Sequence, residues 1–121
     1  RERYDFIYLH FKDFDKAGED GDFDRKVELF ERFDEEVLPR LLELEYDVFC
    51  VTGDHSTPAV MAGHSWHSVP FLLYSPWVRP QVSIEEFGER ACIRGNLGMF
   101  EARHAMSLML AHAGRLRKFG A

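Results

Sequence analysis

The sequence has few cysteines, no excess of positive charge and no long hydrophobic run. Only two of its 121 residues are cysteines, Cys50 and Cys92, and both lie in apolar segments, so we expect free thiols and no disulfide framework. The formal net charge of -6 argues against broad binding to a nucleic-acid backbone. No apolar stretch approaches the ~20 residues of a membrane helix, and we expect no signal peptide. We therefore expect a cytoplasmic protein that binds neither membranes nor nucleic acid.

The composition is that of a folded chain. Hydrophobic residues make up 45% of the sequence and aromatic residues 14%, which is enough material for a core. The length is that of one ordinary domain. The chain opens directly in a strand-like run with no preceding Met, so we expect it to be a piece of a longer protein.

Three segments have the β-branched and aromatic content of buried strands: residues 4–11, 47–52 and 69–74. A polar stretch with two glycines, residues 12–22, is predicted to be a loop after the first strand. Strands that alternate with helical segments indicate an α/β fold. Three strands make a thin sheet with exposed edges, so we expect the open edge to be covered by self-association, a neighbouring molecule or a rearranged terminus.

Helical periodicity extends over residues 22–44, where apolar residues recur at steps of three, four or seven. Asp22 is a candidate N-cap, and Pro39 predicts a kink or break near Val37. A short helix is predicted over residues 83–87 and a last helix over residues 100–119.

Three polar clusters lie at or near the ends of the predicted strands. They are Asp15 with Glu19 or Asp20, the pair Asp54–His55, and His64 with His67. The carboxyl ends of strands in an open α/β sheet line one crevice, so these side chains can converge. Carboxylates and imidazoles are ligands of divalent metals, and a pair of metals would suit phosphoryl transfer.

Each cluster alone also has a simpler interpretation. Asp54 can cap a turn, Asp15 can be an ordinary loop aspartate, and His64 and His67 can be solvated loop histidines. His10 is interpreted as a packed or hydrogen-bonded residue, and His104 and His112 as surface or packing residues. The metal hypothesis therefore depends on the three clusters taken together.

The polar segments resemble a known family. Residues 15–22 (DKAGEDGD), 51–58 (VTGDHSTP) and 64–70 (HSWHSVP), with the carboxy-terminal stretch from Cys92 onward, are similar to 2,3-bisphosphoglycerate-independent phosphoglycerate mutases of the archaeal-type branch. These enzymes belong to the alkaline phosphatase-like superfamily. The resemblance implies an α/β three-layer sandwich with a mostly parallel sheet flanked by helices. Residues 1–121 would then be the C-terminal segment of its metal-binding domain.

The resemblance also implies a set of metal ligands. Asp54 and His55 match the pair that binds one metal, and Asp15 and His64 match ligands of the other. Glu19 stands where the wider family has a histidine, and its carboxylate would favour Mn²⁺ or Mg²⁺ over Zn²⁺. The expected cofactors are two divalent ions, with Mn²⁺ preferred.

The implied reaction interconverts 3-phosphoglycerate and 2-phosphoglycerate through a phosphoserine. No serine of this chain matches the nucleophile position, so we expect no catalytic residue here and no activity of the chain alone. A metal-dependent phosphatase or phosphonate hydrolase of the same superfamily would share the same ligands. A non-catalytic metal-binding or interaction module is the third alternative.

Overall fold

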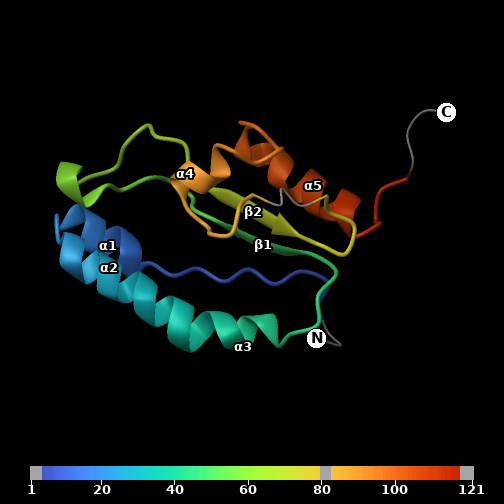
Figure 1. Cartoon of the computed structure of the whole chain (residues 1–121), viewed down its shortest axis with the longest axis horizontal. Helices are drawn as coiled ribbons and strands as arrows, with labels where there is room; N and C mark the ends of the chain where they lie inside the picture. Colours follow the sequence, from blue (N-terminus) through green and yellow to red (C-terminus); the bar gives the residue numbers. More distant parts are fainter. Residues whose placement is uncertain (1–3, 80–82, 118–121) are drawn as a thin grey trace. The chain divides into compact units, whose positions relative to one another are not determined.

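The computed structural model describes residues 4–79 and 83–117 and is a mixed α/β structure (Figure 1). It divides into two compact units. The first contains Arg1–Glu43 and Ser56–Trp66, and the second contains Leu44–His55 and His67–Ala121.

Helix α1 (Asp13–Glu19) replaces the loop that was predicted over residues 12–22, so that prediction was wrong. Two acidic residues in its first turn, Asp13 and Asp15, favour the helix dipole. Ala17 and Gly18 form its buried face. These small residues carry no periodic apolar signal in the sequence, although they allow the chain to pack closely here.

Helix α2 (Phe23–Arg32) begins where the sequence predicted. The carboxylate of Asp22 accepts a hydrogen bond from the backbone N–H of Arg25 at 2.9 Å, which confirms Asp22 as the N-cap. The turn between α1 and α2 contains Gly21 at φ +68°. Its N–H donates to Gly18 and that of Asp22 donates to Ala17, which is a Schellman ending for α1.

The helical stretch changes geometry before Pro39, as expected. A π-helical turn (Phe33–Val37) separates α2 from α3 (Leu38–Leu42), and Pro39 lies in the first turn of α3. Proline has no N–H to donate to the carbonyl four residues earlier, and its ring crowds that carbonyl. The wider π turn is therefore located where a regular α-helix could not continue.

Aromatic rings hold the first unit together. The ring of Phe14 stacks on Phe30 with centroids 4.3 Å apart, and Phe11 meets Phe33 edge-on at 4.7 Å. In Figure 1, α1 and α2 lie side by side, joined by their short turn. Residues 4–11 form no strand, contrary to prediction. Their composition favours an extended chain, but a strand also needs a hydrogen-bonded neighbour.

The second unit contains the one strand pair of the described residues. Strand β1 (Phe49–Thr52) pairs with β2 (Phe71–Tyr74) in an antiparallel register, with Phe49 opposite Tyr74. Both strands lie within predicted segments, which confirms those predictions. This pair is antiparallel, whereas the resemblance implies a mostly parallel sheet. The connection of residues 53–70 is long enough for the crossover that a parallel pair needs, so its length does not decide the antiparallel pairing.

The remaining helices of the second unit differ from prediction in place and length. Helix α4 is Glu89–Cys92, and no helix forms over residues 83–87. Helix α5 (Ala105–His112) follows a 3-10 turn (Ala102–His104) and is much shorter than the predicted 100–119. Gly114 at φ +67° ends α5, with the N–H of Arg115 donating to Leu110. The end of that prediction, residues 118–119, lies outside the described residues.

The buried positions of the described chain are occupied by small side chains. They are Ala17, Gly18, Thr57, Ala59, Ser75 and Ala91. Many large apolar side chains remain exposed, including Val60 at 95% and Trp66 at 84%. Among the described helices, none has the length and apolar character needed to cross a membrane.

Candidate metal centre

Helix α1 brings Asp15 and Glu19 together. They are four residues apart, so both carboxylates project from one face of the helix. The sequence offered Glu19 or Asp20 as the partner of Asp15, and the helical spacing selects Glu19. Asp20 instead forms an exposed ion pair with Lys16, with Oδ2 and Nζ 3.4 Å apart.

His64 faces these two carboxylates from a loop of the same unit. A backbone bridge between Ser56 and Ser65 closes this loop, and the N–H of Ser65 donates to the Ser56 carbonyl at 2.8 Å. The loop contains the 3-10 turn η2 (Ala59–Met61), which packs against α1. The closed loop therefore places His64, which precedes Ser65, next to helix α1.

The geometry of the three side chains is compact. Nε2 of His64 lies 3.4 Å from Oδ1 of Asp15 and 3.4 Å from Oε1 of Glu19. The Asp15 side chain is 32% exposed and that of His64 is 54% exposed, so an ion from solvent can reach them. Carboxylate oxygens and imidazole nitrogens are donors of the kind that bind Mn²⁺ or Zn²⁺.

Thr57 orients the Asp15 carboxylate. Its side chain is buried and its hydroxyl donates to Oδ1 of Asp15 at 2.6 Å. Groups that hydrogen-bond a ligand and fix its orientation are a general feature of metal sites. Thr57 was not among the candidate residues predicted from the sequence, although it lies in the VTGDHSTP segment.

The second predicted pair, Asp54 and His55, lies at the end of β1 in the second unit. The backbone N–H of His55 donates to Oδ1 of Asp54 at 3.0 Å, and Nε2 of His55 lies 3.7 Å from Oδ2. The first of these contacts is the local turn bond that the simpler interpretation of Asp54 expects. The carboxylate and the imidazole nevertheless lie next to each other, as a shared ion would require.

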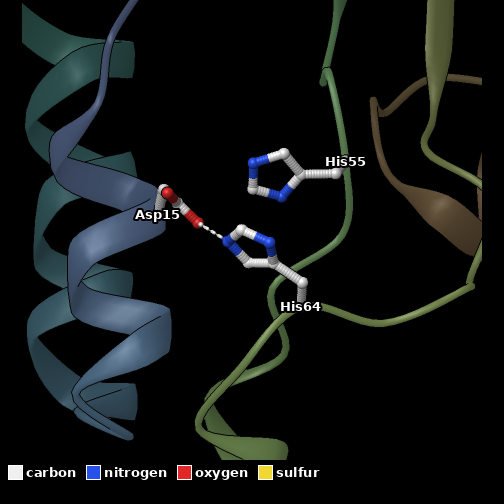
Figure 2. A group of neighbouring side chains, drawn as sticks. All are labelled: Asp15, His55 and His64. Carbon is white, nitrogen blue, oxygen red and sulfur yellow. Dashed lines mark ion pairs between the residues drawn. The ribbon is translucent and has the colours of Figure 1, made fainter.

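The donor chemistry of the predicted residues fits a divalent metal. Within the first unit, Asp15 offers a carboxylate oxygen and His64 an imidazole nitrogen (Figure 2). The dashed line in Figure 2 marks the ion pair between Asp15 and His64. Oxygen and imidazole donors suit Mn²⁺ and Zn²⁺, and no thiolate is among them.

Two of the remaining histidines have other neighbours. The ring of His10 lies 6.1 Å from that of Tyr8, and Nδ1 of His112 lies 3.4 Å from the hydroxyl of Ser75. The ring contact agrees with the interpretation of His10 as a packed residue, and His112 has a polar partner in Ser75. His67 belongs to the second unit, and His104 ends the 3-10 turn before α5.

Comparison with known proteins relates the chain to metalloenzymes. The sequence model of the metalloenzyme superfamily matches residues 1–112. The chain is 49% identical over 118 residues to a protein of Aquifex aeolicus described as a probable 2,3-bisphosphoglycerate-independent phosphoglycerate mutase. It is 51% identical over 119 residues to a protein of Thermus thermophilus with the same description.

These matches cover 98% of this chain but only 28% and 29% of the two relatives, so the chain spans less than a third of their length. A solved structure of the PH0037 protein from Pyrococcus horikoshii is also similar, with a TM-score of 0.89 and 38% identity. That likeness covers 99% of this chain and 37% of the other. The chain therefore belongs to the metalloenzyme superfamily.

Proposed function

We propose that this chain is the C-terminal part of a cofactor-independent phosphoglycerate mutase, which interconverts 3-phosphoglycerate and 2-phosphoglycerate. The observation that carries the proposal is the identity of about half of all residues to probable mutases over 98% of the chain. The arrangement of Asp15, Glu19 and His64 supports it, because a mutase of this superfamily needs metal ligands here.

The proposed role of the chain is to bind divalent metal ions, with Mn²⁺ as the preferred ion. Asp54 and His55 would hold one ion, and Asp15 and His64 would hold the other, with Glu19 as an additional oxygen ligand. When bound, two such ions neutralise charge on a transferred phosphoryl group and lower the pKa of the attacking hydroxyl. The phosphoserine of the proposed reaction would come from outside these 121 residues.

The chain's own residues would prepare the site before any ion arrives. The Thr57 hydroxyl holds one oxygen of Asp15, and the Ser56–Ser65 bridge holds the loop that carries His64. Both restraints reduce the number of side-chain conformations that binding has to fix. Both restraints lie within the first unit.

Metal binding is tested by calorimetric titration of Mn²⁺ into the wild-type chain and the variants Asp54→Ala and His64→Ala. His104→Ala is the matched control, because it removes an imidazole that the proposal does not use. We expect saturable binding in the wild type and the control, and a loss of roughly 100-fold or more in affinity in the two variants, since each loses a proposed ligand. Equal affinity in all four proteins would contradict the metal assignment.

The substrate is tested in a chimera. The chain replaces the matching segment of the Thermus thermophilus relative, to which it is 51% identical. We expect the chimera to interconvert the two phosphoglycerates and to lose this activity with Asp15→Asn. A chimera that folds and binds Mn²⁺ but only hydrolyses phosphate esters would favour the phosphatase alternative.

A further inference from the structure

Lys26 is a partly buried lysine in the first unit, close to the proposed ligands. It lies in the first half of α2, and its ammonium donates to the backbone carbonyl of Thr57 at 2.5 Å. The hydroxyl of this same Thr57 donates to Asp15. Lys26 therefore contacts the residue that orients a proposed metal ligand.

The surroundings of Lys26 hold its side chain in place. It lines an apolar cavity of about 310 Å³ together with Phe23, Val27, Phe30 and Pro58, so its methylene groups have packing partners. The hydrogen bond to Thr57 is partly buried, which strengthens it relative to a bond in water.

Gly18 shows how closely these groups pack. A methyl group at Gly18 would lie 3.0 Å from the Lys26 nitrogen and would clash with the carbonyl oxygen of Thr57. Helix α1, the ammonium of Lys26 and the Thr57 carbonyl are therefore in direct contact. A shift of Lys26 would disturb Thr57, because the ammonium donates directly to the Thr57 carbonyl.

We propose that Lys26 is a positioning residue, which fixes the Thr57 backbone so that the Thr57 hydroxyl holds the Asp15 carboxylate for metal binding. The metal part of this inference rests on the proposed function. The link from Lys26 to Asp15 through Thr57 does not, because it is built from hydrogen bonds within the first unit.

The proposal is tested with Lys26→Met, which keeps the length of the side chain but cannot donate, and with Thr57→Val, which removes the hydroxyl at similar size. Lys16→Met is the matched control, since Lys16 is an exposed lysine of α1. We expect Mn²⁺ affinity to fall about 10-fold to 100-fold in Thr57→Val and about 10-fold in Lys26→Met, with no change in the control.

A variant that carries both Lys26→Met and Thr57→Val shows whether Lys26 acts on Asp15 through Thr57. If Lys26 acts through Thr57, the variant carrying both substitutions binds Mn²⁺ as weakly as Thr57→Val alone. Additive losses, or an affinity of Lys26→Met equal to that of the control, would overturn the proposal. Urea denaturation of each variant shows whether the protein under study is folded.

A second readout needs no metal. The ¹³C resonance of the Asp15 carboxyl reports its hydrogen bonding, and we expect it to move in the same direction in Lys26→Met and Thr57→Val. A resonance that moves only in Thr57→Val would overturn the positioning role. If the wild type binds no Mn²⁺, the proposed function fails, and this measurement still decides the role of Lys26.

Discussion

At the scale of single residues, close approach explains Gly18 better than backbone freedom does. Gly18 is a helical residue of α1, and no positive φ requires glycine there. A side chain at this position would instead run into the Thr57 carbonyl and the Lys26 ammonium. The hydrogen atom of glycine lets α1 and the loop of residues 56–66 come into contact.

We expect Gly18→Ala to destabilise the chain by about 1–3 kcal/mol, because the added methyl group overpacks a filled site. Gly63→Ala is the control, since a methyl group there would have only the ordinary contact with Met61 at 3.8 Å. Urea denaturation measures both. A Gly18→Ala chain as stable as the wild type would show that the contact can relax.

Burial raises the pKa of the Cys50 thiol from 9.0 to about 11. The folded state therefore keeps the thiol protonated at a pH where the unfolded chain already forms thiolate. We expect the free energy of unfolding to fall between about pH 9 and pH 11, because only the unfolded state loses this proton there. The difference between the wild type and Cys50→Ala, measured by urea denaturation across that range, isolates the effect. A difference that stays constant with pH would contradict it.

At the scale of elements, local signals in the sequence placed α2 and both strands, while packing decided α1. The N-cap Asp22 and the apolar spacing after it are properties of neighbouring residues, so the start of α2 could be predicted. Helix α1 depends on Phe14 stacking on Phe30 and on the burial of Ala17. Those partners are far away in sequence or too small to give a periodic signal.

The N-cap of α2, Asp22, gives a prediction at the scale of elements. Asp22→Ala removes the acceptor of the Arg25 N–H, and we expect a loss of about 1 kcal/mol in stability. Asp34→Ala, at an exposed aspartate in the π turn, is the control and should change stability little. Urea denaturation followed by circular dichroism checks both. Equal losses of stability in Asp22→Ala and Asp34→Ala would mean that the Asp22 cap contributes nothing beyond its charge.

At the scale of the whole molecule, the described residues bury little large apolar surface. Val60, Trp66, Ile93 and Met99 are each more than four-fifths exposed, while the buried side chains are small. Exposed apolar surface on this scale is typical of faces that contact other protein. The chain also spans less than a third of the relatives it matches.

We expect the isolated chain to self-associate through its exposed apolar surface, because association removes that surface from water. Sedimentation velocity at increasing protein concentration measures this. A sedimentation coefficient that rises with concentration is the expected result. A monomer at every concentration would contradict the prediction.

We also expect the isolated chain to give no interconversion of 3-phosphoglycerate and 2-phosphoglycerate, because the proposed function takes the phosphoserine from outside these 121 residues. A coupled assay with added Mn²⁺ measures this. Turnover that is lost in His64→Ala would contradict the prediction, because it would mean that these 121 residues supply every reacting group.

Residue type and short spacing were enough to predict the start of α2, the segments of β1 and β2, and three polar clusters with candidate ligands. The resemblance to a known family narrowed these clusters to Asp15, Glu19, Asp54, His55 and His64, which stay a prediction. Packing across the chain was needed to make α1 a helix, to pair β1 and β2 antiparallel, and to place Thr57 and Lys26 in support of Asp15. Thr57 lies 42 residues from Asp15 and 31 from Lys26, so tertiary contacts and not local spacing bring them together.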